Sequence, residues 1–92
     1  MHKGTLSRES VLRAIEECDE AGADAFRETY GFGRARVYVL HHEGRTYDSK
    51  AIAGVAHRHE YGRALTSEEF SGGKAAAVAW LERVGFVVER IR

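Results

Sequence analysis

A strand pair in the middle of the chain, with helical patterns on both sides, constrains the fold more than any other feature. Residues 36–41 (RVYVLH) are rich in β-branched and aromatic side chains, which is typical of a strand. Glu43-Gly44 can turn the chain into a shorter return strand over residues 45–47, so a hairpin is predicted. Because apolar residues recur at helical spacing in the flanking segments, this hairpin has to bury one face against helices.

Two helices are predicted before the hairpin. Ser7 is suited to cap the first helix, and Gly22 ends it. Asp24 is expected to cap a short second helix, which stops at Gly31. The predicted buried stripe of the first helix consists of Val11, Leu12, Ile15 and Cys18.

A third helix is predicted directly after the hairpin. Either Asp48 or Ser49 caps it, and Gly62 ends it. Gly54 within this helix permits the close approach of another backbone. The predicted core stripe consists of Ile52, Val55, Ala56 and His59.

The remaining chain completes a mixed fold. A capping box at residues 66–69 predicts a single helical turn, and a last helix follows residues 71–73 and stops at Gly85. Residues 86–91 (FVVERI) are predicted to form a final strand. The order ααββααβ indicates an α+β fold, with four to five helices packed on one face of a small, about three-stranded antiparallel sheet.

Length and composition suit one small folded domain spanning residues 1–92, since 43% of the 92 residues are apolar. No apolar run approaches membrane-span length and no secretory signal pattern is present, so we expect no membrane association. Cys18 is the single cysteine and has no neighbours at zinc-ligand spacing, which indicates a reducing, cytoplasmic setting.

Charge is zero overall but unevenly distributed. Residues 1–32 contain four Lys/Arg and seven Asp/Glu, whereas residues 33–63 contain six Lys/Arg and three Asp/Glu. A basic centre in a neutral chain suits salt-sensitive nucleic-acid binding, or docking against an acidic protein surface. The acidic face of the first predicted helix, which we expect to be solvated, consists of Glu9, Glu16, Glu17 and Glu20.

Two of the three lysines, Lys50 and Lys74, stand in the first turns of predicted helices. Since a helix N-terminus carries partial positive charge, a cation there is unfavourable by ~0.3–1 kcal/mol, which suggests a nearby anion. Exposed amides, small residues and a lysine together suit a phosphate. The alternative is that both lysines are solvated and the glycines only turn the chain. The other residues of these two candidate phosphate sites are Ser49, Ser71, Gly72 and Gly73.

Arginines and aromatic residues extend the candidate DNA-binding set. Arginine side chains reach phosphates or guanine edges, and an aromatic face can pack against a base or its methyl group. Core packing is the alternative for each aromatic, although Tyr47 stands next to the Ser49-Lys50 helix start. These additional candidates are Arg34, Arg36, Tyr38, Arg45, Tyr47 and Arg58.

Catalytic and metal sites are not predicted. His41 and His42 are adjacent on a strand and point to opposite faces, while His57 and His59 diverge by roughly 200° on a helix. Neither Cys18 nor any serine stands in a nucleophile motif. His59, on the apolar stripe, is expected to be a core histidine. We therefore expect no enzymatic activity, no metal and no cofactor.

Three segments carry a family resemblance: residues 47–57 (YDSKAIAGVAH), 70–73 (FSGG) and 80–86 (WLERVGF). Together they resemble the N-terminal head domain of McrA-type, modification-dependent HNH restriction endonucleases, and the likeness extends from Leu6 to Val88. The pairing of a Tyr-x-x-Lys-x-Ile helix start with a Phe-Ser-Gly-Gly turn is its most specific part. The matching motif positions are Tyr47, Ser49, Lys50, Ser71, Gly72 and Gly73.

The resemblance implies that the chain binds modified double-stranded DNA, with 5-methylcytosine as the expected modification, as part of a restriction system. It implies no cleavage activity, because the chain contains no HNH motif. In that family the head domain precedes further DNA-reading domains and the nuclease. The alternative is therefore a module that docks other domains of a larger nuclease without base recognition. The limited room in 92 residues favours groove contact over base flipping, which needs an enclosed pocket.

Overall fold

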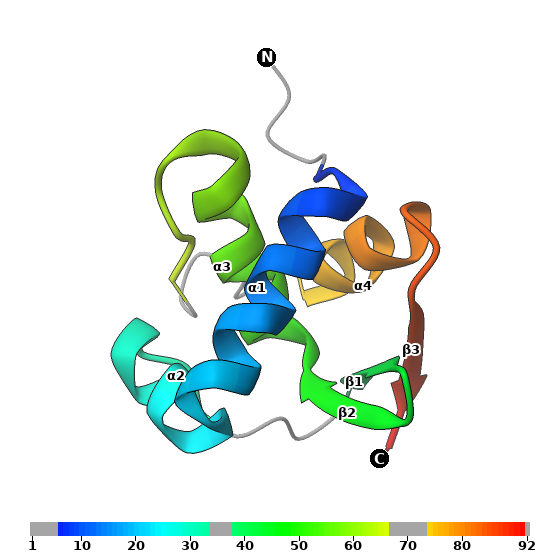
Figure 1. Ribbon diagram of the computed structural model, residues 1–92. Coiled ribbons are helices and arrows are strands. Elements are labelled where there is room, and N and C mark those ends of the chain that lie inside the picture. The colour runs from blue at the N-terminus through cyan, green and yellow to red at the C-terminus, as the bar shows by residue number, and fades with distance from the viewer. Residues whose placement is uncertain (1–5, 34–37, 67–73, 92) are drawn as a thin grey trace.

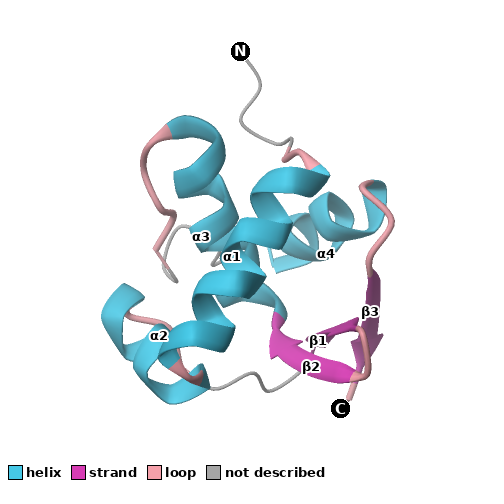
Figure 2. Cartoon of the chain, viewed as in Figure 1, coloured by secondary structure: helices cyan, strands magenta, loops and turns pink. Residues whose placement is uncertain are grey.

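The computed structural model has the α+β class and the element order ααββααβ that the sequence predicts (Figure 1, Figure 2). The structure describes residues 6–33, 38–66 and 74–91, without the side chains of residues 74–76. The helical turn predicted at 66–69 therefore lies almost wholly outside the described residues. The elements are α1 (Arg8–Ala21), α2 (Ala23–Tyr30), β1 (Tyr38–His42), β2 (Arg45–Asp48), α3 (Ser49–Tyr61), α4 (Lys74–Arg83) and β3 (Val87–Arg90).

The sheet has three antiparallel strands in the order β2-β1-β3, which confirms the predicted hairpin and final strand. Leu40 of β1 pairs with Tyr47 of β2 and with Val88 of β3, so these three side chains share one face. Leu40 and Tyr47 are buried there, whereas Thr46 and Val87, on the opposite face, are exposed. The helices lie together to one side of this small sheet (Figure 1).

The largest helix–helix interface joins α1 and α3, which cross near the centre of the molecule (Figure 1). Gly54 makes the close approach that the sequence predicts: a Cβ there would lie 2.6 Å from Cζ of Phe32 and 2.9 Å from the carbonyl oxygen of Leu65. The amide of Leu65 donates to the carbonyl of Gly54 at 3.1 Å. The fully buried large side chains of this core are Val11, Phe26, Leu40, Ile52, Val55 and Leu81.

The helix boundaries follow the predicted caps with one correction. The Ser7 side chain accepts a hydrogen bond from the amide of Ser10, and Gly31 ends α2 in the left-handed conformation. Gly22, not Asp24, is the N-cap of α2, because its φ of 90° turns the chain directly out of α1. Asp24 instead lies in the first turn and pairs with Arg27.

The core histidine of α3 is His57, not His59 as the sequence predicted. His57 is 8% exposed, and its Nδ1 lies 2.6 Å from the carbonyl oxygen of Arg63. Because a carbonyl can only accept, Nδ1 carries the proton. The buried stripe of α3 turns away at the last helical turn, so His59 reaches the surface and contacts Glu17.

The described residues form neither a metal site nor a membrane-spanning helix. No group of three or more His, Cys, Asp or Glu side chains could hold a metal ion there. No helix in this part of the chain is long and apolar enough to cross a membrane.

Candidate nucleic-acid interface

The structure describes about half of the predicted DNA-binding set. Lys74 begins α4, but its side chain lies outside the described residues. Arg34, Arg36, Ser71, Gly72 and Gly73 lie entirely outside them. The candidates with described side chains are Tyr38, Arg45, Tyr47, Ser49, Lys50 and Arg58.

The start of α3 brings three of these candidates together. The hydroxyl of Ser49 donates to the carbonyl of Tyr38 at 3.1 Å, which fixes the start of β1 against the start of α3. Lys50 follows in the first helical turn. The segment carrying Arg34 and Arg36 precedes Tyr38 in the chain, so the sequence of the basic centre leads directly into this junction.

An anion does lie at this helix start, and it belongs to the protein. The Asp48 carboxylate caps α3 by accepting a hydrogen bond from the amide of Ala51 at 3.0 Å. Burial raises the pKa of Asp48, and the amides of Ala51 and Lys50 together with the nearby charges of Arg27 and Lys50 only partly oppose that rise. A DNA phosphate at this end would therefore contact the Lys50 side chain rather than replace the cap.

The hairpin carries a second carboxylate-centred contact. Oδ1 of Asp19, on α1, accepts a hydrogen bond from the Tyr47 hydroxyl at 2.8 Å and lies 3.2 Å from Nη1 of Arg45. Tyr47 is only 8% exposed, and burial followed by the Asp19 contact raises its pKa. Tyr47 thus packs the hairpin against the helices, while the guanidinium of Arg45 stays at the surface with its side chain 67% exposed.

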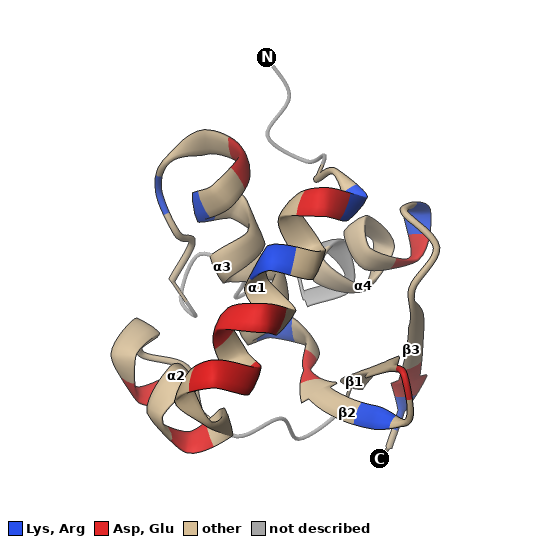
Figure 3. Cartoon of the chain, in the orientation of Figure 1, with Lys and Arg blue, Asp and Glu red and all other residues tan. Residues whose placement is uncertain are grey.

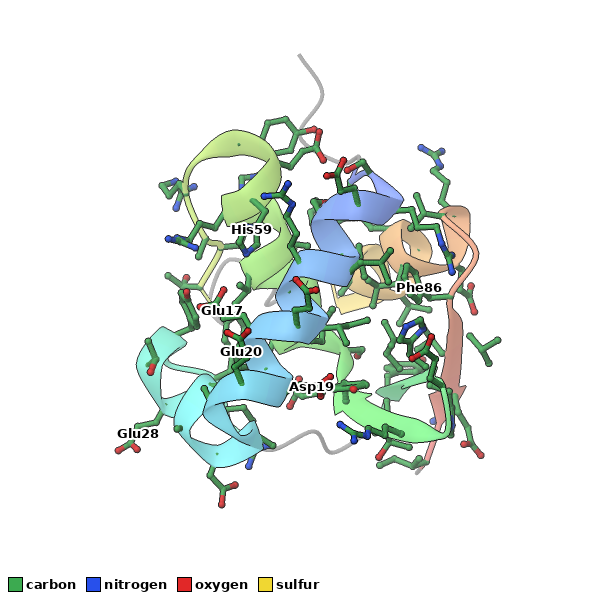
Figure 4. All side chains as sticks on the ribbon, in the orientation of Figure 1. Glu17, Asp19, Glu20, Glu28, His59 and Phe86 are labelled. Atoms are coloured by element: carbon green, nitrogen blue, oxygen red, sulfur yellow. The ribbon has the colours of Figure 1, made fainter. Side chains whose placement is uncertain are left out.

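A third carboxylate holds Arg58. Glu17 Oε2 accepts a hydrogen bond from the Tyr30 hydroxyl at 2.5 Å, while its Oε1 lies 3.2 Å from His59 and 3.8 Å from Arg58. This cluster joins α1, α2 and α3, and Figure 4 shows Glu17 on the side of α1 toward His59, with Asp19 toward the hairpin. Glu17 therefore corrects the expectation that the acidic face of α1 is simply solvated.

Two cavities flank the Asp19 contact. One of about 530 Å³ lies between the α1–α2 junction and β2, and its lining includes Asp19, Arg27, Arg45 and Asp48. A second cavity, of about 450 Å³, shares Asp19, Arg45 and Tyr47 with the first. Two carboxylates and two guanidinium groups line the first cavity, so the formal net charge of its lining is zero.

Charge is segregated on the surface of the molecule. In Figure 3, positions occupied by Asp and Glu are coloured along the second half of α1 and on α2. Arg45 and Arg58 both contact carboxylates of α1, so neither guanidinium is an uncompensated charge. The sequence offered no signal for Glu17 and Asp19 as partners, because Glu17 belongs to the acidic face that we expected to be solvated and Asp19 lies among its acidic neighbours in the chain.

Comparisons with known proteins agree with this fold. The sequence model described as "ScoMcrA-like, N-terminal head domain" matches residues 4–90. A solved structure described as the type IV phosphorothioation-dependent restriction endonuclease ScoMcrA superposes with a TM-score of 0.70 at 42% sequence identity. The match covers 95% of this chain and 13% of that protein. Among curated proteins, no sequence matches significantly. The chain therefore belongs to the family of ScoMcrA-like N-terminal head domains.

Proposed function

We propose that this chain is a non-catalytic module that binds duplex DNA in a modification-dependent restriction system. The observation that carries the proposal is its membership of the head-domain family, together with 42% identity to a relative described as a phosphorothioation-dependent restriction endonuclease. Because the match covers 13% of that relative, our proposal assigns cleavage in such proteins to parts outside the head domain.

The proposed DNA contacts lie along β2 and the start of α3. Arg45 begins β2, and Lys50 follows its end in the first turn of α3. At ~3.3 Å per residue, β2 from Arg45 to Asp48 spans roughly 10 Å, so Arg45 and Lys50 lie near its two ends as separate candidate phosphate contacts. The remaining members of the proposed interface are Arg34, Arg36, Tyr38, Ser49, Arg58, Ser71, Gly72, Gly73 and Lys74.

Because that relative is described as phosphorothioation-dependent, phosphorothioate is favoured over 5-methylcytosine as the modification. A phosphorothioate carries its sulfur on the DNA backbone, where Arg45 and Lys50 are proposed to bind. A cytosine methyl in a groove would need an accessible apolar face. Tyr47 offers little such surface, because it is 8% exposed and its hydroxyl is bound to Asp19. The half-buried Tyr38 remains the better candidate for a methyl contact.

Fluorescence anisotropy with three otherwise identical duplexes tests the proposal. One duplex is unmodified, one carries a phosphorothioate and one carries 5-methylcytosine. We expect salt-sensitive binding to all three, with the highest affinity for the phosphorothioated duplex. A preference for the methylated duplex would restore the expectation from sequence, and salt-insensitive or absent binding would contradict the proposal.

Matched arginine variants locate the contact. Arg45→Ala should weaken binding to every duplex and lower the salt slope by about one unit. The control is Arg13→Ala, because Arg13 forms a comparable exposed pair with Glu9 at 3.1 Å on the first half of α1. Equal losses in both variants would show that net charge, rather than the position of Arg45, determines binding.

A docking module for other domains of a larger nuclease is the second candidate function. The open face of the sheet favours it, because Val87 is 64% exposed there and Ile91, just beyond β3, is 49% exposed. A mainly apolar dock should be almost insensitive to salt, unlike phosphate binding. Val87→Lys should abolish docking to the rest of such an endonuclease and leave DNA binding unchanged.

A further inference from the structure

The Asp19 carboxylate, on α1, forms an ion pair with Arg45, the arginine to which the proposed function assigns DNA binding. Asp19 Oδ1 lies 3.2 Å from Arg45 Nη1, and the two side chains are 37% and 67% exposed. The same oxygen accepts the Tyr47 hydroxyl hydrogen bond at 2.8 Å. Asp19 is thus fixed by a buried residue, while its arginine partner reaches solvent.

We propose that Asp19 is a positioning residue that competes with DNA phosphates for Arg45 and so keeps the affinity for unmodified duplex DNA low. The inference rests on the proposed DNA-binding function and adds a residue that opposes it. Binding then exchanges one anion for another: the Asp19 carboxylate releases the guanidinium, and a phosphate oxygen accepts its hydrogen bonds.

The geometry lets a phosphate displace Asp19 from Arg45, but it does not let Asp19 move with Arg45 toward the DNA. An exposed ion pair contributes ~0–1 kcal/mol, so a phosphate can displace Asp19 at modest cost. Asp19 cannot follow Arg45 toward the DNA, because the Tyr47 hydroxyl holds it and Tyr47 is buried in the core. The released carboxylate therefore stays beside the hairpin, where it repels the approaching phosphate.

Glu17 and Arg58 form a weaker version of the same arrangement. Their closest atoms are 3.8 Å apart, and Glu17 also binds Tyr30 and His59. Removing the charge of Glu17 would disturb contacts among three helices, whereas Asp19→Asn keeps an oxygen that can accept the Tyr47 hydrogen bond. Asp19 is therefore the cleaner position to change.

The test compares Asp19→Asn with Glu20→Gln, which raises the net charge by the same amount one residue along α1. Among the described residues Glu20 has no ion-pair or hydrogen-bond partner, so its neutralisation frees no arginine. Asp19→Asn should raise the affinity for unmodified duplex about two- to fivefold, as expected for removal of a surface pair, and Glu20→Gln clearly less. Both should keep the thermal midpoint of the wild type.

A double variant decides whether the gain passes through Arg45. In an Arg45→Ala background, Asp19→Asn should lose its advantage over Glu20→Gln. Equal gains from both neutralisations, or a gain that persists without Arg45, would overturn the inference while leaving the proposed function intact. If neither the wild type nor any variant binds a duplex, the proposed function fails, and the inference fails with it.

Discussion

The start of α3 places Lys50 near the Asp48 carboxylate, and the hairpin places Arg45 beside the Asp19 carboxylate. The two regions differ in how firmly the fold holds the carboxylate. Asp48 is linked to the helix that it caps, accepts the amide of Ala51 and is partly buried. Asp19 reaches Arg45 from another element, and that pair is exposed. The first carboxylate is part of the fold, whereas the second is the one that a phosphate would displace in the proposed exchange.

This difference changes what a lysine at a helix start indicates. From sequence, Lys50 suggested a phosphate beside α3, yet the Asp48 carboxylate already lies there. Arg45 was predicted only because arginine side chains in general reach phosphates, yet its partner Asp19 is the one that the proposed exchange displaces. A positive charge near a helix start thus predicts an anion without saying whether the protein or a ligand supplies it.

Removing the ring of Tyr47, which stands between the two regions, should have the largest effect. Tyr47→Ala should lower the free energy of unfolding by about 3 kcal/mol, because it empties a buried aromatic site and releases Asp19. Urea denaturation measures this. A variant that folds as stably as the wild type but loses modified-DNA preference would instead make Tyr47 a reader of the modification.

Changing the cap should have an intermediate effect confined to the first region. Asp48→Ala should cost about 1 kcal/mol of stability, since the amide of Ala51 loses its acceptor, whereas Asp48→Asn keeps the cap. If Asp48→Ala strengthened DNA binding by opening the helix start to a phosphate, the distinction between the two regions would fail.

The pH dependence of stability sharpens the same point. Burial raises the folded-state pKa of Asp48 above its ordinary value of 3.8, so the Asp48 carboxyl binds its proton more tightly in the native state than in the unfolded chain. Protonation of Asp48 therefore stabilises the native state. This contribution is complete below the pKa of Asp48 in the unfolded chain and is lost as pH rises through its pKa in the folded state. Asp48→Asn should remove this contribution, which stability curves between about pH 3 and 7 would measure. An unchanged pH dependence in the variant would contradict the assignment to Asp48.

The exposed pair should matter least for stability. Arg45→Ala should change the free energy of unfolding by less than about 1 kcal/mol, because its ion pair with Asp19 is solvent-exposed. Thermal denaturation at low and high salt provides the measurement. A loss of several kcal/mol would mean that Arg45 is a structural residue and not a surface available to DNA.

Local patterns predicted most of the fold. The cap at Ser7, the turn at Glu43-Gly44 and the close approach at Gly54 each follow from short-range chemistry that the sequence displays. The errors concern which side of a helix is buried and which side chains pair across the fold. His57 rather than His59 is buried because the last turn of α3 leaves the core, a tertiary effect.

The candidate site was less predictable than the fold, because long-range partners define it. Asp19 and Arg45 are 26 residues apart, and Glu17 and Arg58 are 41 apart. No local pattern distinguishes these two carboxylates from the solvated residues around them on α1. The burial of Tyr47 also depends on packing between elements, so the sequence could not decide whether its ring faces DNA or the core.

The salt dependence of binding to a phosphorothioated duplex tests the proposed interface most directly. The wild type and the double variant Arg45→Ala/Lys50→Ala would be titrated from low to physiological salt. Two lost phosphate contacts should lower the slope of log affinity against log salt by about two units, with the fold intact. A slope that is unchanged in the double variant would contradict DNA binding through the hairpin and the start of α3.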